Sequence, residues 1–319
     1  MKTNKDTAVA YAVLLVYALA GGFSFICSKT AVALATPLQT LSVRFTIAFL
    51  GAVAMLASGK FHFCLKGPHK GQLALAVGGY VGFLGIQAWG LLFTTSIVSG
   101  ILFAVVPVLA RLVGGVVLKE GSTWVQNAFA ALSVGSVIAM FVIGSGDSLG
   151  SVSVPGFLIL LLASISYAVG NVYMRVVKPY YSPFTISFCS CTVGFLAFGG
   201  AAVVRCLLKG GWGAFFAPVG DARFLGSVAY LGIVCTLITG ALISFALRTL
   251  PAMSATIFGN LSTAISVVAG ALVLGEPLYA YQIVCTVLIA VGVLGISIFT
   301  GRQAGKGGQP APQEKEAQE

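Results

Sequence analysis

The sequence contains two similar copies, and each copy holds an odd number of apolar segments of membrane-spanning length. Thr36-Pro37-Leu38 in the first copy is repeated as Ser182-Pro183-Phe184 in the second. Near the end of each copy, Glu120 and Glu276 close matching apolar runs. Because an odd number of crossings reverses the direction of a chain, the second copy must enter the membrane in the opposite sense to the first.

The apolar segments predict ten membrane-spanning helices. About 20 apolar residues cross a bilayer as a helix, and the chain is 58% hydrophobic and only 8% charged, against about 25% charged in soluble domains. We predict an all-α membrane protein with ten transmembrane helices in two inverted five-helix repeats, residues 1–145 and 152–300. The expected spans are Thr7–Thr30, Pro37–Ala57, Gly71–Phe93, Ile97–Leu118 and Trp124–Ile143, then Ser153–Arg175, Pro183–Val204, Arg223–Leu247, Ala252–Leu274 and Tyr279–Phe299.

The Lys and Arg residues predict the orientation. With the N-terminus inside, twelve of the 18 lie in cytoplasmic segments, four lie outside and two lie within spans. This bias places both termini in the cytoplasm, for a protein of the cell inner membrane. The net charge of +10 therefore reflects orientation, and we expect no nucleic-acid partner. Residues 301–319 are polar and predict a disordered C-terminal tail.

The first segment allows a second interpretation. Lys2, Lys5 and Ala18-Leu19-Ala20 are similar to a cleavable signal peptide. Its removal would leave nine spans and destroy the match between the copies. We therefore expect the segment to be a retained helix.

Acidic and histidine side chains are missing from the predicted spans. Asp147 and Asp221 lie in loops, and His62 and His69 lie between the second and third spans. The carboxylates and imidazoles that serve membrane enzymes, metal sites and proton relays are thus absent from the interior. The seven cysteines are odd in number and mostly lie in apolar spans. We expect no enzyme, no metal site and no cofactor.

Two arginines lie inside predicted spans. Arg111 precedes Glu120 by nine residues, or roughly 13 Å of helix. An arginine near the middle of a span costs about 3 kcal/mol, so it should face the interior of the bundle. We predict that Arg111 binds a carboxylate or phosphate of a substrate. Pro107 should free the carbonyl of Phe103, and these two residues should share a face with Arg111.

Arg44 lies in the second span and allows two interpretations. Its guanidinium either binds an anionic substrate or joins helix ends through backbone carbonyls.

Several polar and aromatic residues complete the predicted binding site. Buried amides need hydrogen-bond partners, which a substrate or a neighbouring helix supplies equally well. Aromatic side chains line apolar cavities, although they more often serve ordinary packing. The further candidates for substrate binding are Gln87, Trp89, Tyr167, Asn171, Thr239 and Asn260.

The order of several short segments resembles a known family. Gly21-Gly22-Phe23-Ser24-Phe25 lies in the first span, Arg44 lies in the second, and Ser166-Tyr167-Ala168-Val169-Gly170-Asn171 lies in the sixth. Together with the endings at Glu120 and Glu276, they are similar to the EamA-type transporters of the drug/metabolite transporter superfamily. The resemblance covers residues 8–300 and implies export by a secondary transporter.

The resemblance also bears on individual residues. Ala20 stands where the family often has a tryptophan, and Arg111 is not part of its general pattern. Because the family shares Arg44 among members with unlike substrates, we predict a structural role for it. We assign a structural or gating role to Glu120 and Glu276, whose expected partners are Lys119 and the backbone amides near Trp124 and Tyr279.

These observations predict an inner-membrane exporter of small metabolites, such as amino acids or organic anions, that works by alternating access. Its partners would be the small-molecule substrate and the lipid bilayer, and it would be a monomer or a homodimer. The alternatives are an exchanger of sugar phosphates or nucleotide sugars and a membrane sensor or assembly protein without transport activity. Proton antiport, exchange and facilitated diffusion all remain open.

Overall fold

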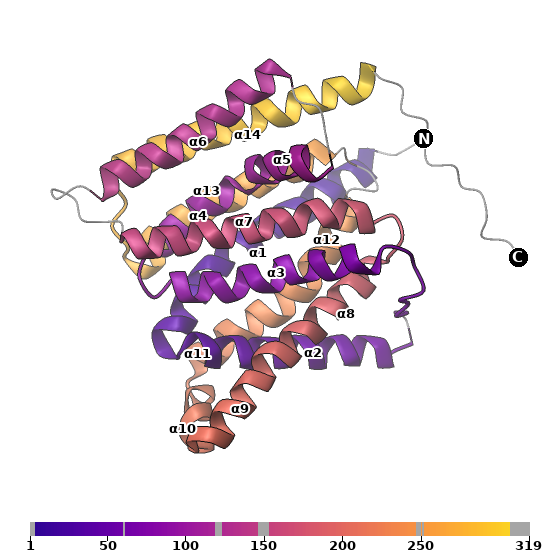
Figure 1. Cartoon of the computed structure of the whole chain (residues 1–319). Helices are drawn as coiled ribbons and strands as arrows, with labels where there is room; N and C mark the ends of the chain where they lie inside the picture. Colours follow the sequence, from indigo (N-terminus) through magenta and orange to yellow (C-terminus); the bar gives the residue numbers. More distant parts are fainter. Residues whose placement is uncertain are drawn as a thin grey trace, which may run out of the picture.

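The computed structural model describes residues 4–59, 61–118, 123–145, 153–246, 250 and 252–306, which form helices and short connections without a strand (Figure 1). The first copy contains α1 (Asn4–Leu34), α2 (Pro37–Ala57), α3 (Lys70–Gly90), α4 (Ser96–Ala104), α5 (Val106–Val117) and α6 (Trp124–Gly144). The second contains α7 (Val154–Val177), α8 (Pro183–Gly194), η1 (Phe195–Gly199), α9 (Gly200–Lys209), α10 (Trp212–Phe216), η2 (Ala217–Gly220), α11 (Ala222–Ala229), η3 (Tyr230–Ile238), α12 (Thr239–Ala246), α13 (Ala252–Leu274) and α14 (Ala280–Lys306).

The expected all-helical membrane fold is confirmed. Among the described residues, nine helices are long and apolar enough to span a membrane, and α4 with α5 forms a bent pair that makes a tenth if it counts as one span. The helices α8, η1 and α9 form one continuous span, Pro183–Lys209. A second continuous span, Ala222–Ile243, consists of α11, η3 and the first part of α12. The ten spans agree with the apolar segments of the sequence.

The end of the last helix differs from expectation. α14 continues to Lys306, so residues 301–306, which were assigned to a disordered tail, are helical. A helix ends where its backbone hydrogen bonds end, not where its side chains become polar. Arg302, Gln303 and Ala304 are all good helix formers. Residues 307–319 lie outside the described part of the chain.

The repeated proline motif begins a helix in both copies. The Thr36 hydroxyl accepts a hydrogen bond from the backbone N–H of Gln39 at 3.4 Å, and the Ser182 hydroxyl accepts one from Thr185 at 3.1 Å. Both helices have proline in their first turn, where its missing N–H has no helical partner to lose. Local sequence therefore sets the starts of α2 and α8 in the same way.

Helices from different copies pack against each other throughout the bundle. The contact between α3 and α7 is the most extensive, followed by those of α1 with α13 and of α6 with α14. A methyl group on Gly79 would lie 2.6 Å from the Cα atom of Gly170. The backbones of α3 and α7 therefore touch directly, without side chains between them.

The fourth span is broken near Pro107. Its two halves, α4 and α5, meet at an angle of 41°. The carbonyl of Leu102 accepts the Val105 N–H at 3.3 Å and the Ser164 hydroxyl at 3.2 Å. The expected free carbonyl of Phe103 is not found, because a backbone N–H just beyond the end of α4 donates to it. The chain tightens into shorter hydrogen-bonded turns at the break, and the Ser164 hydroxyl of α7 gives the Leu102 carbonyl a second donor.

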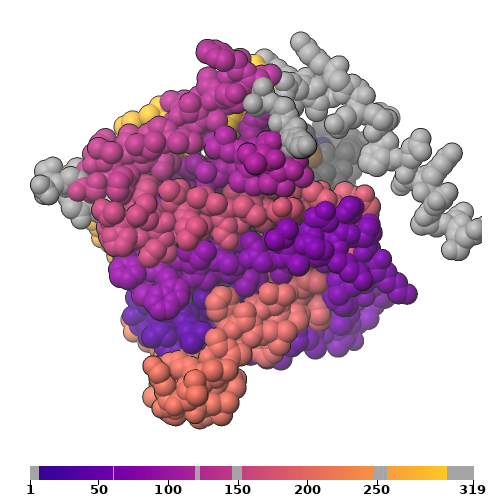
Figure 2. Space-filling model, viewed as in Figure 1, coloured from indigo at the N-terminus to yellow at the C-terminus, as the bar shows by residue number. Residues whose placement is uncertain are grey.

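The bundle has two ends. We call the end that carries the start of α1, the end of α7 and the start of α8 the near end; α14 also ends there (Figure 1). The opposite, far end carries the end of α3 and the start of α4. The segment from α9 to α10 projects as a knob from the bottom of the molecule in this view (Figure 2).

Candidate functional site

Two adjoining chambers lie between the copies. The outer chamber has a volume of about 510 Å³ and the inner chamber about 110 Å³. Both chambers are lined by helices of both copies, which is where inverted-repeat carriers hold their substrates. We call the residues that line both chambers the neck: Tyr17, Tyr80, Tyr167, Cys235 and Thr239.

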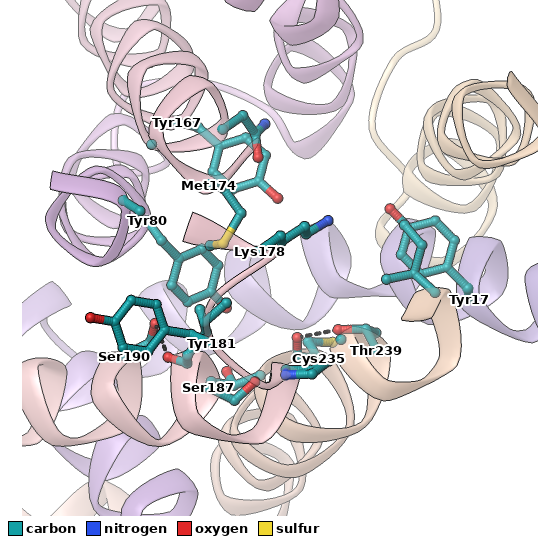
Figure 3. A pocket seen from close by; sticks show the side chains of 18 residues that line it. Tyr17, Tyr80, Tyr167, Met174, Lys178, Tyr181, Ser187, Ser190, Cys235 and Thr239 are labelled. Atoms are coloured by element: carbon teal, nitrogen blue, oxygen red, sulfur yellow. Dashed lines mark hydrogen bonds between the residues drawn. The ribbon is translucent and has the colours of Figure 1, made fainter. Parts of the chain in front are cut away.

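The outer chamber reaches the near end of the bundle. Its lining includes Lys178, Tyr181 and Pro183, at the turn between α7 and α8. Figure 3 shows Tyr80, Tyr167 and Lys178 on one side of the chamber, facing Tyr17 across it. No Asp or Glu of the described chain lines either chamber. The walls are therefore aromatic and hydroxyl-bearing, with a basic group at the mouth.

Lys178 is the cation at this mouth. Partial desolvation, and secondarily the guanidinium of Arg175, lower the pKa of the Lys178 ammonium from its ordinary value. Both causes disfavour the charged form. An anion beside Lys178 would act in the opposite direction.

Four packed aromatic rings line the inner chamber. The ring centroid of Phe83 lies 4.8 Å from that of Tyr167 and 5.6 Å from that of Phe103. Phe103 also lies 5.4 Å from Phe25 in an edge-on arrangement. These distances are typical of favourable aromatic pairs. The rings come from α1, α3, α4 and α7, so the inner chamber is enclosed by packed side chains from both copies.

Arg44 lines the inner chamber from α2. It is only 5% exposed, and its Nη2 donates to the hydroxyl of Thr236 at 3.4 Å. Its Nε atom is buried without a hydrogen-bond partner among the described residues. Sequence reasoning favoured a structural link from Arg44 to backbone carbonyls, but the structure records a side-chain partner, Thr236, and a buried donor without a partner among the described residues.

Two π-helical segments lie against the helix that carries this arginine. Both η1 and η3 pack against α2. Within η3, the Thr236 hydroxyl donates to the carbonyl of Leu231 at 2.9 Å and can accept from Arg44 at the same time. A methyl group on Gly232 would lie 2.8 Å from the Arg44 carbonyl oxygen. π-Helical turns are rare and occur frequently at functional sites; here they bring η3 against α2 and Thr236 to the guanidinium.

Lys29 fixes the turn between α3 and α4 at the far end. Its ammonium donates to the carbonyl oxygens of Leu91 and Thr94, each at 2.6 Å. Below this turn, the Gln87 amide donates to the Ser99 hydroxyl at 3.2 Å. These contacts join α1, α3 and α4 between the inner chamber, which Gln87 lines, and the far end.

Glu276 fixes the same turn from the second copy. Its carboxylate accepts hydrogen bonds from the Ser96 N–H at 2.8 Å, the Ser96 hydroxyl at 2.7 Å and the Ile97 N–H at 3.1 Å. The expected partner near Tyr279 is therefore wrong. The start of α4 offers unpaired N–H groups and a favourable helix dipole, which stabilise a carboxylate. Glu120 lies outside the described residues.

Some of the substrate-binding residues predicted from the sequence line the chambers. Gln87 and Phe103 line the inner chamber, Asn171 lines the outer chamber, and Tyr167 and Thr239 belong to the neck. The Thr239 hydroxyl donates to the Cys235 carbonyl at 2.6 Å.

The remaining predicted residues line neither chamber: Trp89, Pro107, Arg111 and Asn260. Trp89 is 55% exposed, and Pro107 is also exposed. Arg111 donates to Gln126 of α6. The bend at the break turns α5 away, so Pro107 and Arg111 do not share the chamber-facing side of Phe103. Asn260 has a buried amide nitrogen without a partner among the described residues.

Sequence reasoning missed several chamber residues. Ser187 and Ser190 lie three residues apart on α8, a spacing that places them on one helix face. That pattern was available in the sequence. Tyr17, Tyr80 and Lys178 gave no such signal, because each is a single polar group on an apolar helix or at a helix end. Within the described residues, no group of three His, Cys, Asp or Glu is placed to hold a metal.

Comparison with known proteins agrees with this architecture. The model of the EamA-like transporter family matches the chain twice, at residues 8–142 and 154–298. The chain belongs to the EamA-like transporter family. It is a multi-pass membrane transporter built from two EamA repeats, and the resemblance seen in the sequence is confirmed.

Individual relatives add two observations. A Bacillus subtilis (strain 168) protein described as "Uncharacterized transporter YcxC" is 31% identical over 303 residues, covering 95% of this EamA chain and 97% of that protein. A protein of known crystal structure superposes with a TM-score of 0.61 at 17% identity, covering 93% of this chain and 99% of the other. The second likeness concerns the fold alone.

Proposed function

We propose that this EamA protein is a secondary carrier that exports a small organic metabolite through the two chambers by alternating access. One observation carries the proposal: a cavity lined by both copies, open at the near end and enclosed at the far end. Such a cavity lies at the repeat interface, where inverted-repeat carriers bind substrate. Its size suits a small metabolite rather than a macromolecule.

The contacts of Lys29 and Glu276 support a closed far end. They hold the α3–α4 turn from two sides, one belonging to each copy. Alternating access requires one end to close while the other opens. We assign Glu276 and Lys29 to the gate that closes the far end in this conformation.

The Lys and Arg distribution supports a near end that faces the cytoplasm. In that orientation the outer chamber loads from inside the cell, as an exporter in the inner membrane requires. An exchanger of sugar phosphates is less well supported, because Arg44 and Lys178 are the only basic residues in the chamber linings of the described chain.

Counterflow in liposomes tests this proposal. Purified protein is reconstituted and screened with amino acids, organic acids and sugar phosphates. In the variant Ser187→Trp, an indole fills much of the outer chamber, and we expect it to abolish the flux of whichever solute the wild type moves. The matched variant is Val193→Trp on the same helix, where Val193 is 43% exposed; it should retain flux. Absence of flux of every solute by folded wild-type protein would refute the carrier, and equal flux in both variants would refute this route.

A further inference from the structure

We propose that Arg44 is the anchor for a substrate carboxylate and that the carrier accepts small organic monocarboxylates in preference to amino acids and neutral amides. The inference rests on the proposed transport function and names the substrate class of the same site. It assigns to Arg44 the binding role that sequence reasoning gave to Arg111.

The first argument is the unfilled bonding capacity of Arg44. A guanidinium carries five N–H donors, and the described residues give it one hydrogen-bond acceptor, Thr236 at 3.4 Å. Its Nε is buried and unpaired, and the side chain is only 5% exposed. A buried charge without a partner is costly. A carboxylate in the inner chamber, which Arg44 lines, supplies the missing charge and two oxygens that accept from the guanidinium N–H groups at the chamber surface.

The second argument is the charge of the chambers. Their linings contain Arg44 and Lys178, and no Asp or Glu of the described chain. The carboxylate of Glu276 lines neither chamber and accepts three hydrogen bonds at the start of α4. A single anionic group on the substrate therefore meets cations at the mouth and at the inner end. A cationic group meets no opposite charge along this path.

The third argument is the shape of the site. The inner chamber, at about 110 Å³, has room for a carboxylate and little more, whereas the outer chamber, at about 510 Å³, has room for the rest of a small molecule. The neck joins them with Tyr80, Tyr167 and Thr239. An uncharged, partly apolar body would contact these rings and hydroxyls while its carboxylate reaches Arg44.

The same geometry disfavours amino acids. An α-ammonium lies two bonds from its carboxylate carbon, so it would sit in the inner chamber beside Arg44. There it would face a like charge, and no acidic residue of the described chain lines this chamber to compensate. Like charges at such short range raise the free energy of the bound state.

Thermal stability in detergent tests the anchor directly. The probes are butyrate, 3-phenylpropionate and indole-3-propionate, each compared with its primary amide and with 2-aminobutyrate, phenylalanine or tryptophan. We expect at least one acid to raise the melting temperature of wild-type protein, while its amide and amino acid cause no shift at the same concentration. Equal shifts by acid and amide, or no shift by any acid, would overturn the inference.

The variants Arg44→Gln and Arg111→Gln separate binding from structure. We expect Arg44→Gln to weaken acid binding at least about 30-fold and to leave the melting temperature of the ligand-free protein unchanged or raised, because an unpaired buried charge is gone. Arg111→Gln should keep the ligand-induced shift. A purely structural Arg44 would instead lower the ligand-free melting temperature and leave acid affinity in the remaining folded protein unchanged.

Counterflow distinguishes this inference from the carrier itself. If wild-type protein transports amides or amino acids as readily as acids, and Arg44→Gln transports them equally, the anchor is refuted while the carrier stands. If acids shift the melting temperature but no solute crosses the membrane, the anchor stands and the carrier is refuted. Arg44→Lys keeps the charge but loses the planar fork, and we expect intermediate acid affinity.

Discussion

In the first copy, α2 and α3 run as uninterrupted α-helices, whereas their counterparts in the second copy contain the π-helical segments η1 and η3. The fourth helix shows the reverse: it is broken between α4 and α5 in the first copy and continuous as α13 in the second. The copies thus place their irregular turns in different helices. The segments η1 and η3 both pack against α2, and η3 and α4 line the inner chamber through Cys235 and Phe103.

The helix starts show the opposite behaviour. Thr36 and Ser182 cap α2 and α8 in the same way. Gln126 and Gln282 each accept a hydrogen bond from the backbone N–H three residues earlier, at 3.0 Å and 3.2 Å. The repeated scaffold is therefore alike at these helix starts and unlike around the inner chamber, where η3 and the α4–α5 break have no counterpart in the other copy.

Exchanging the residues at the fourth-helix break should have the largest effect. Pro107 in the first copy corresponds to Thr263 in the second. Thr263→Pro would remove a hydrogen bond inside α13 and clash with the preceding turn, at a cost of about 3 kcal/mol or more. Pro107→Thr should cost less than about 1 kcal/mol, because Pro107 is exposed in the first turn of α5.

The melting temperature of each variant is measured by heating samples and determining the remaining folded protein by size-exclusion chromatography. A stable Thr263→Pro protein would show that the second copy tolerates the same break. It would contradict the view that α13 must be continuous where the α4–α5 pair is broken.

The close approach of η3 to α2 gives a smaller effect. A methyl group on Gly232 would lie 2.8 Å from the backbone oxygen of Arg44, which cannot rotate away. Gly232→Ala should therefore destabilise the protein by about 1–3 kcal/mol. Gly226→Ala on the preceding helix meets open space and should be neutral or stabilising by up to about 1 kcal/mol. Melting temperatures of the two variants in the same detergent make the comparison, and equal values would contradict a tight η3–α2 contact.

Weakening the gate at the far end should have the smallest effect on stability. Glu276→Gln removes the charge that the start of α4 favours, at a cost of about 1–2 kcal/mol. Such a cost corresponds to roughly a 5- to 30-fold shift between conformations. Ser28 lines the inner chamber and is 8% exposed, so Ser28→Cys reports the opening in a background whose seven native cysteines are replaced by serine. We expect faster labelling of this cysteine from the far side in Glu276→Gln; an unchanged rate would remove Glu276 from the gate.

Much of the fold can be predicted from local sequence. The ten apolar runs, the proline caps at Thr36 and Ser182, and the break near Pro107 each depend on residues close together in the chain. The π-helical turns could not be predicted, because a π-turn adds one residue to a helical turn and its residues have no distinctive composition. In η3 the turn is stabilised by packing against α2, a contact distant in sequence.

The site was harder to predict than the fold. Arg44 and Arg111 are similar in sequence terms, each a lone cation in an apolar span. Their surroundings depend on which helix face meets the cavity: α2 turns Arg44 to the inner chamber, and α5, after its bend, turns Arg111 to Gln126 of α6. The partners of Glu276 likewise lie 180 residues away in the chain. Such contacts follow from the assembled bundle, not from periodicity.

The direct backbone contact of α3 with α7 bears on how the molecule moves. Where Gly79 meets Gly170, the backbones of the two helices are in contact and no side chains between them can rearrange. We therefore expect α3 and α7 to move together as one rigid body. Tyr80 and Tyr167 belong to that body, while Tyr17 and Thr239 lie on α1 and α12. The two moving parts of the carrier would then each combine helices from both copies, and the boundary between them would run through the cavity rather than through the middle of the sequence.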